Sequence, residues 1–269
     1  MRDFKSDYGP WAVIAGASAG IGAAYARNLA AKGLNLVLVS RRKKVLDGLA
    51  RWIASRYPVA VRSVPLDLGG KGFPGKLKDA TRDLDVGLLI CNATFPCTGE
   101  FLDHPVKDHL RLIDVNCRAP VVLIHHYSGL MKKRKRSGII LMSSLAAFSG
   151  TPWLSHYGAS KSYILGLGEG LAYELRAGKI DMLVCCPGAT GTENYYASLP
   201  KSGASGIPVM KPDSVAGAAL KALGRTSVLI PGVLNGLAAF FMNRILGRRA
   251  AVSIMAGVGR KLYQKKARG

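Results

Sequence analysis

A tyrosine and a lysine lie four positions apart in this chain, at Tyr157 and Lys161. In a helix this spacing places both side chains on one face, one turn apart. The ammonium would favour the phenolate, so we expect the tyrosine pKa to fall below its usual value of about 10. Such a phenol could exchange a proton with a carbonyl or an alcohol near neutral pH. The spacing also occurs by chance in helices and needs further support.

Support comes from a serine and from a glycine-rich loop. Ser144 lies thirteen residues before Tyr157, directly after an apolar run at 138–142 that predicts a strand. The loop Gly16–Gly22 follows a predicted strand at 11–15 and opens a predicted helix at 20–32. Glycines permit the tight turn and let a pyrophosphate approach the helix N-terminus, where free amides favour anions. An ordinary glycine turn is the alternative, but the strand–turn–helix context favours a dinucleotide.

The end of the second predicted strand indicates which dinucleotide. Residues 34–39 form an apolar run that ends at Ser40, Arg41 and Arg42. Sites that prefer NAD usually carry an acidic residue here, which binds the ribose 2′-hydroxyl. A guanidinium instead offers charge and paired donors to a 2′-phosphate. We therefore expect NADP(H), with ordinary surface arginines as the alternative.

Apolar runs alternate with helical segments along the chain. Further strands are predicted at 60–66, 86–91, 138–142, 180–185 and 227–230, and further helices at 43–56, 105–131, 157–176 and 212–223. This alternation predicts an α/β fold, a doubly wound parallel sheet with helices on both faces. The 269 residues suit one domain, 1–269. The Gly-, Ser- and Pro-rich connection at 190–211 is long enough to be functional.

Charge and cysteine content indicate the cellular compartment and the kinds of partner that we expect. The N-terminus is charged and lacks the apolar core of a signal peptide, and five cysteines match no zinc spacing. We expect reduced core thiols in a cytoplasmic protein and no metal site. The formal net charge of +22 predicts attraction to polyanions. The basic run at 132–136 is interpreted as a helix C-terminus, where cations are favourable.

The segment 231–269 is a basic, apolar-rich extension that we expect to be helical. No acidic residue follows Asp213, whereas ten lysines or arginines do. Our preferred interpretation is a helix packed over the substrate cleft or against another subunit. The alternative is a peripheral contact with an anionic membrane. No nucleic-acid motif accompanies the charge, so we expect no specific nucleic-acid binding.

Three polar residues follow or interrupt the predicted elements. Asp67 ends the third strand, where a turn or cap would also explain it, and Asn92 ends the fourth. Asn116 lies within a predicted helix, where asparagine is neutral to unfavourable and so needs a reason.

With all these motifs in this order, the chain resembles the short-chain dehydrogenase/reductase superfamily, of the NADPH-preferring kind. The resemblance runs from about Pro10 to Ile230. It implies a single Rossmann domain with a seven-stranded parallel sheet. It also implies that Tyr157 protonates the substrate carbonyl, Ser144 orients the substrate oxygen, Lys161 holds the nicotinamide ribose, and Asn116 holds a water for proton relay.

The resemblance also implies a set of residues that bind the cofactor. These are Gly16, Ser18, Ala19, Gly20, Ile21, Gly22, Ser40, Arg41, Arg42, Asp67, Asn92, Ala93, Tyr157, Lys161, Pro187, Gly188, Thr190 and Thr192. Two positions depart from the family pattern. Thr94 stands where the family usually has glycine, and Ala19 stands where many NADPH-preferring members have a basic residue.

These features predict an NADPH-dependent oxidoreductase that reduces a hydrophobic ketone or aldehyde, steroid-like or acyl-chain in character. The reverse reaction would be alcohol oxidation. The alternative is a catalytically silent NADP(H) sensor or a membrane-surface scaffold. The resemblance further implies a homo-oligomer, a dimer or a tetramer.

Overall fold

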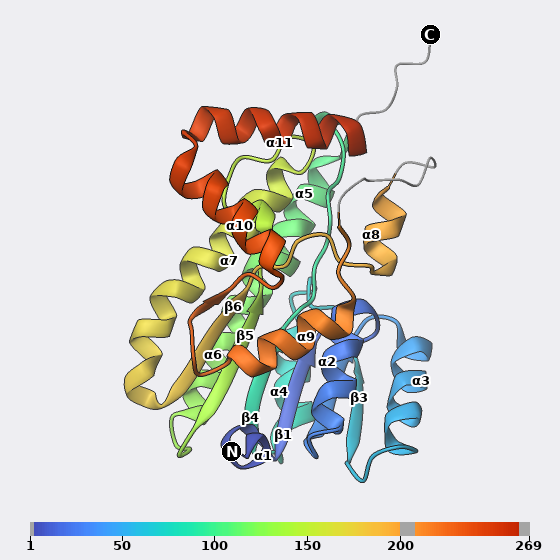
Figure 1. Ribbon diagram of the computed structural model, residues 1–269. Helices are drawn as coiled ribbons and strands as arrows, with labels where there is room; N and C mark the ends of the chain where they lie inside the picture. Colours follow the sequence, from blue (N-terminus) through green and yellow to red (C-terminus); the bar gives the residue numbers. More distant parts are fainter. Residues whose placement is uncertain (1–2, 200–207, 264–269) are drawn as a thin grey trace.

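The computed structural model describes residues 3–199 and 208–263, and a parallel sheet lies at its centre (Figure 1). The strands run in the order β3-β2-β1-β4-β5-β6-β7, all parallel. Their bounds are β1 (Trp11–Ala15), β2 (Asn35–Ser40), β3 (Val61–Pro65), β4 (Val86–Cys91), β5 (Ser137–Met142), β6 (Ile180–Cys185) and β7 (Val228–Leu229). The predicted seven-stranded, doubly wound α/β fold is confirmed. The strand order reverses between β1 and β4, and such a switch point is where ligands bind in open α/β sheets.

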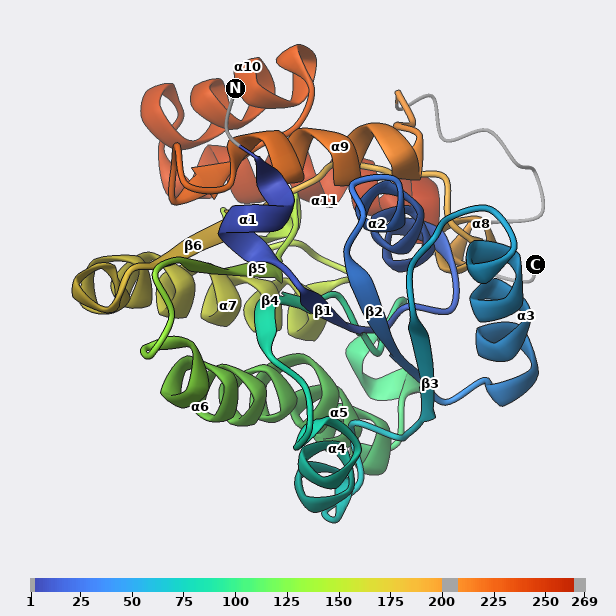
Figure 2. The same cartoon turned by 90° about the horizontal axis from the view of Figure 1, so that it is seen from below.

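The central strands are apolar without alternation because helices cover both of their faces. Every residue of β4 and β5 is buried. One face carries α2 (Gly20–Ala30), α3 (Lys43–Ala54) and α9 (Pro212–Ala222). The other carries α4 (Phe73–Thr81), α6 (Ala119–Met131) and α7 (Ser155–Glu174), as the view along the sheet shows (Figure 2).

Most predicted elements occur within a few residues of their expected bounds, but three short helices were not predicted. These are α1 (Phe4–Tyr8), α4 and α8 (Glu193–Ser198). Only Phe73, Leu77 and Thr81 of α4 are buried, so its apolar periodicity is weak. The loop expected at 190–211 contains α8, and residues 200–207 lie outside the described part of the chain.

The helix predicted at 105–131 is three consecutive pieces. They are α5 (Val106–Ile113), a π-helical turn (Asp114–Arg118) and α6. A π-turn inserts an extra residue into the helix and is often found at functional sites.

The basic run at 132–136 follows the end of α6 at Met131, as interpreted from the sequence. Arg134 pairs with Asp85 and donates to the Gly9 carbonyl. Arg136 Nε donates to Asp181 Oδ2 at 2.6 Å. Two of its five cations therefore stabilise the amino-terminal end of the sheet.

The described part of the C-terminal extension, 231–263, is mostly helical. It consists of α10 (Val233–Phe240), a second π-turn (Phe241–Ile245) and α11 (Arg248–Tyr263). Both helices lie at the end of the molecule where the strands have their carboxyl ends (Figure 1). Within residues 3–199 and 208–263, no helix is long and apolar enough to cross a membrane. All five cysteines are free and buried.

Candidate active site

The side chains of Tyr157 and Lys161 both lie in the first two turns of α7, as the sequence predicts. Lys161 is only 4% exposed, and its Nζ donates to the Met142 carbonyl at 2.9 Å, at the end of β5. The same Nζ lies 5.4 Å from the centroid of the Tyr157 ring. The expected phenol–ammonium pair is therefore present at the carboxyl end of the sheet.

The pKa of Tyr157 differs from the expectation. Burial raises it to about 12, a hydrogen bond with Ser144 opposes this rise, and Tyr263 adds to it. Burial likewise lowers the pKa of Lys161 to about 8. The expectation that Lys161 holds the tyrosine pKa below its usual value is thus wrong for the chain by itself. The desolvation of both groups outweighs their mutual influence, and the phenol is protonated at neutral pH.

Ser144 is positioned by the turn that follows β5. Its side chain caps a short 3-10 turn (Leu145–Ala147) by accepting from the Ala146 amide at 3.2 Å. The neighbouring Ser143 hydroxyl donates to the Lys161 carbonyl at 2.8 Å and so fixes this turn against α7. Ser144 and Tyr157 consequently lie within hydrogen-bonding reach, where a carbonyl oxygen could accept from both hydroxyls.

Asn116 lies in the first π-turn and is almost fully buried. Its Oδ1 accepts from the Phe95 amide at 2.8 Å, and its Nδ2 donates to the Phe95 carbonyl and to the Ser160 hydroxyl, both at 3.1 Å. These bonds join the segment after β4 to α7 and explain the asparagine within a helix. Thr94 donates to the same Oδ1 at 3.3 Å, so the departure from the family pattern serves this junction.

The glycine loop between β1 and α2 is a tight turn that packs against the segment after β4. A Cβ at Gly22 would meet the Gly16 carbonyl oxygen at 1.9 Å. Gly16 has a φ of +91°, and the Asn92 side chain donates to its carbonyl at 2.8 Å. Only glycine fits these positions, and the N-terminus of α2 follows directly. The loop therefore fits a dinucleotide pyrophosphate.

Arg42 lies at this loop. The Ser40 hydroxyl donates to the Ser18 hydroxyl at 2.8 Å, and Arg42 NH2 donates to the same Ser18 oxygen at 3.3 Å. The other Arg42 nitrogen pairs with Glu193 of α8 at 2.8 Å. Two hydroxyls and a guanidinium therefore converge at the end of β2, a donor set that fits a 2′-phosphate.

The remaining predicted cofactor residues lie around the same edge of the sheet. Asp67 accepts from the Gly69 amide at 3.0 Å and pairs with Arg111, so its turn-forming role is observed. Thr192 caps α8, and a Cβ on Gly20 would touch its methyl group at 2.7 Å.

After β6, the Pro187 carbonyl accepts from the Leu145 amide at 3.0 Å, and Thr190 donates to the Gly188 carbonyl at 3.0 Å. Ala19 lies in the glycine loop, Ile21 in the first turn of α2, and Ala93 in the segment after β4.

The extension covers the loop that precedes Tyr157. A Cβ on Gly259 of α11 would meet the Pro152 carbonyl oxygen at 2.7 Å and the Trp153 ring at 2.8 Å. Trp153 has a φ of +62°, which is strained for a bulky residue. Tyr263, at the end of α11, has a hydrogen bond with Ser198 of α8 and acts on the pKa of Tyr157. These contacts place α11 on the loop that precedes Tyr157, and the interpretation of 231–269 as a helix over the substrate cleft or against another subunit stays a prediction.

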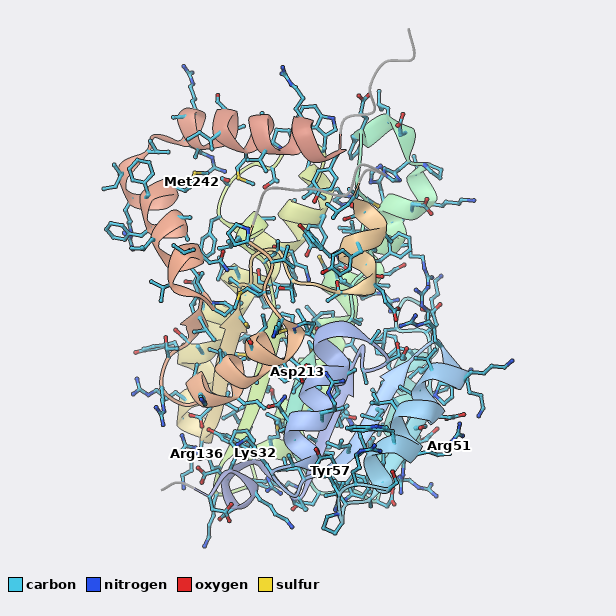
Figure 3. All side chains as sticks on the ribbon, turned by 45° about the vertical axis from the view of Figure 1, so that its right-hand side comes forward. Lys32, Arg51, Tyr57, Arg136, Asp213 and Met242 are labelled. Atoms are coloured by element: carbon cyan, nitrogen blue, oxygen red, sulfur yellow. The ribbon has the colours of Figure 1, made fainter. Side chains whose placement is uncertain are left out.

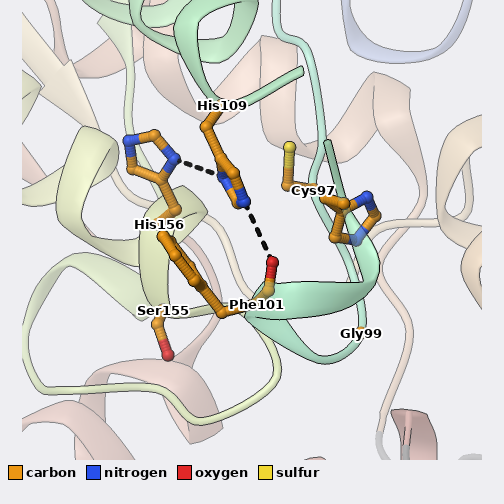
Figure 4. Close-up of a pocket in the computed structure, with 7 residues that line it drawn as sticks. Cys97, Gly99, Phe101, His109, Ser155 and His156 are labelled. Atoms are coloured by element: carbon orange, nitrogen blue, oxygen red, sulfur yellow. Dashed lines mark hydrogen bonds between the residues drawn. The ribbon is translucent and has the colours of Figure 1, made fainter. Parts of the chain in front are cut away.

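A histidine pair lies beside Tyr157 and lines a small pocket together with Cys97 and Phe101 (Figure 4). His109 Nε2 lies 3.0 Å from the Phe101 carbonyl, and its Nδ1 lies 2.9 Å from His156 Nδ1. A carbonyl only accepts, so neutral His109 carries its proton on Nε2 and His156 carries one on Nδ1. Within the described ranges, no group of three His, Cys, Asp or Glu side chains could hold a metal ion.

The sequence did not single out His109, Glu193 or Tyr263. Each acts through a partner far away in the chain, and nothing local marks it. The substrate side of the site is therefore visible only in the structure. On the sheet side, a protonated phenol, a hydroxyl and a buried amine lie at the carboxyl end of the sheet beside the glycine loop, and this set of groups could protonate a carbonyl oxygen.

Comparison with known proteins agrees with this geometry. The sequence model of the family described as short chain dehydrogenase matches residues 10–201. A 7beta-hydroxysteroid dehydrogenase of Clostridium sardiniense is 31% identical over 233 residues, which cover 87% of this chain and 89% of that protein.

Two solved structures are also similar. A structure of 7beta-hydroxysteroid dehydrogenase superposes with a TM-score of 0.89 at 29% identity, covering 95% of this chain and 100% of the other. A short-chain dehydrogenase from Sphingobium yanoikuyae in complex with NADPH gives a TM-score of 0.76 at 31% identity, covering 88% and 96%. The chain belongs to the short-chain dehydrogenase/reductase family of oxidoreductases.

Proposed function

We propose that this protein is an NADP(H)-dependent oxidoreductase that reduces a bulky, apolar ketone of the steroid class to an alcohol, and oxidises the alcohol in reverse. The observation that carries the proposal is the convergence of Ser144, Tyr157 and Lys161 at the carboxyl end of the sheet. Two of the similar proteins are 7beta-hydroxysteroid dehydrogenases, which favours a steroid-like substrate.

In this proposal Tyr157 is the general acid. Its pKa of about 12 keeps the phenol protonated at neutral pH, so it can donate a proton to the substrate carbonyl oxygen. NADPH, when bound, supplies the hydride that the carbonyl carbon accepts. The carbonyl thus gains a hydride at carbon and a proton at oxygen, which yields the alcohol. Ser144 holds the oxygen by a second hydrogen bond.

Lys161 and Asn116 support the acid. The Lys161 ammonium, fixed on the Met142 carbonyl, stabilises the tyrosinate that forms as the proton leaves. A proton from solvent must then restore the phenol. We assign that relay to the Lys161 amine, whose pKa of about 8 suits proton exchange near neutral pH. Asn116, which joins Ser160 to the segment after β4, would position this relay.

The choice of NADP(H) over NAD(H) rests on the end of β2. Ser18, Ser40 and Arg42 form a donor cluster there, and no carboxylate of β2 opposes a phosphate. Glu193 is the nearby acid, and it pairs with Arg42 through an exposed contact. A phosphate can compete for the guanidinium at such a surface site, because exposed ion pairs stabilise little.

The test is NADPH oxidation, followed by absorbance, with ketones and aldehydes that range from small and aromatic to long-chain acyl and steroidal. Tyr157→Phe is the matched variant, since it removes the proton donor and keeps the ring. We expect turnover of the bulky apolar ketones, a preference for NADPH over NADH, and a loss on the order of 10²–10⁴ in the variant.

Equal turnover by Tyr157→Phe would overturn the mechanism. Tight NADPH binding by both proteins, with no turnover of any carbonyl, would instead support a silent cofactor sensor. Preference for a small ketone would contradict the proposed substrate class, but it would still agree with Tyr157 as the proton donor.

A further inference from the structure

The α10 helix exposes its large apolar residues and packs its small and polar residues against the protein. Val233, Leu234 and Leu237 point outward and are 80%, 68% and 61% exposed. The small Ala239 is buried, and Asn235 donates inward to the Pro231 carbonyl at 2.9 Å. A helix whose outer face meets only water has its large apolar residues inside. Here the small and polar residues pack on the protein and the large apolar ones do not.

The apolar face continues beyond α10. Phe240 ends the helix, and Phe241 and Ile245 follow in the second π-turn, all at least half exposed. The positions 233, 234, 237, 240, 241 and 245 repeat at three- and four-residue intervals, which places them on one side of the helix. We call this set the outer apolar face. Soluble surfaces rarely carry a contiguous apolar area of this kind unless something binds it.

The charged residues of the segment that carries the outer apolar face are all positive. Arg244, in the second π-turn, and Arg248 and Arg249, at the start of α11, are exposed. Between positions 214 and 263 the sequence contains no aspartate or glutamate. A symmetric contact between two copies would bring these arginines together with no acid from the same segment to neutralise them. An anionic surface, in contrast, complements both the charge and the apolar side chains.

We propose that the outer apolar face docks on an anionic lipid bilayer. The six apolar side chains enter the boundary between headgroups and acyl chains, and the three arginines bind the lipid phosphates. None of the helices in the described ranges can span a membrane, which fits a segment that lies in the interface. The docking does not rest on the proposed reaction. It would place α11 and the cleft beneath it next to the bilayer, where an apolar ketone is concentrated.

The test is flotation of the purified protein with vesicles of phosphatidylcholine, with and without phosphatidylglycerol. The main variant is Leu237→Ser/Phe240→Ser. The matched control is Leu130→Ser/Tyr173→Ser, which removes two exposed side chains from α6 and α7. We expect the control to bind vesicles that contain phosphatidylglycerol as the unchanged protein does. The main variant should lose about a hundredfold in partition, since each of the two buried apolar side chains contributes roughly tenfold.

A second pair of variants tests the charge. Arg244→Gln/Arg248→Gln/Arg249→Gln should lose most of the preference for phosphatidylglycerol, because each basic residue near the surface contributes roughly fivefold. The control is Arg51→Gln, on α3. Met242, in the turn between α10 and α11, and Arg51 lie at opposite ends of the molecule (Figure 3). A melting curve for each variant checks that the fold is retained.

Two outcomes would overturn the proposal. Equal flotation of Leu237→Ser/Phe240→Ser and the unchanged protein would show that net charge alone causes the binding. Loss of a dimer in light scattering by that variant, with unchanged flotation, would show that a second copy covers the face. Neither result depends on turnover, so failure here is distinct from failure of the proposed reaction.

Discussion

The two sides of the active site are built differently. On the sheet side, buried bonds to the backbone fix the reacting groups: Lys161 Nζ donates to the Met142 carbonyl, and Ser143 donates to the Lys161 carbonyl. On the extension side, α11 rests on the 150–153 loop through small residues such as Gly259, and Tyr263 lies near Tyr157. The chemistry is therefore rigidly positioned, whereas the surface that would meet the substrate can change without disturbing it.

After Tyr157, the largest loss of turnover should come from a change of the buried lysine. Lys161→Met should lower turnover by roughly 10²–10³, as loss of a fixed electrostatic group does. The same variant should have a higher free energy of unfolding than the natural protein. The Lys161 pKa is about 8 folded and 10.5 as a free side chain, so keeping it charged costs on the order of 3 kcal/mol at pH 7. Loss of the bond to Met142 offsets roughly 1 kcal/mol of that gain.

The gain in folding stability of Lys161→Met should depend on pH in a defined way. The unfolded chain binds the Lys161 proton more tightly, so the natural protein becomes more stable as pH rises from 8 to 10.5. The advantage of Lys161→Met should be largest below pH 8 and vanish above pH 10.5. Chemical denaturation at several pH values measures it. An advantage that does not change with pH would contradict the buried-charge explanation.

Substitution of one glycine on each side tests how tightly the backbone is packed there. A Cβ at Gly22 would lie 1.9 Å from the Gly16 carbonyl oxygen, so Gly22→Ala should destabilise by more than about 3 kcal/mol and abolish NADPH binding. Gly236 of α10 has nothing within 4 Å of such a Cβ. Gly236→Ala should stabilise by up to about 1 kcal/mol. Thermal unfolding and cofactor titration of both variants give the measurement, and similar effects at the two sites would remove the contrast.

The cofactor preference should depend on one of two adjacent arginines. Arg42→Ala should raise the KM for NADPH by roughly 10- to 100-fold, the value of a lost charge-assisted contact, and leave that for NADH nearly unchanged. Arg41→Ala is the matched control and should change either KM by less than about threefold, as a screened surface charge does. A larger effect at Arg41 would show that we have chosen the wrong guanidinium.

The smallest effect should come from the extension side. Tyr263→Phe removes the hydroxyl that bonds to Ser198 and should raise the KM for a bulky ketone by roughly two- to tenfold, with little change in kcat. Tyr173→Phe, at an 85% exposed position of α7, is the control and should change neither constant. A fall in kcat alone would instead place Tyr263 in the chemical step.

The comparison also explains what could be predicted from the sequence. The sheet and the catalytic set are marked by local patterns: apolar runs, the glycine loop, and the spacing from Ser144 to Lys161. The pKa of Tyr157 was predicted in the wrong direction, because spacing shows the nearby charge but not the depth of burial. The contacts of Tyr263 and Glu193 join segments that are distant in the chain, and no periodicity encodes them.

The ion pair between Arg42 and Glu193 connects the two sides of the site. An anion that takes Arg42 must release Glu193, the first residue of α8, and α8 also contacts Tyr263 through Ser198. A ligand that shifts α8 and a ligand that binds Arg42 therefore change each other's affinity through the Arg42–Glu193 ion pair. By thermodynamic linkage, any factor by which the dinucleotide changes affinity for the ketone must equal the factor by which the ketone changes affinity for the dinucleotide. In the proposed function, the coupling between the two ligands would then pass through a single exposed salt bridge.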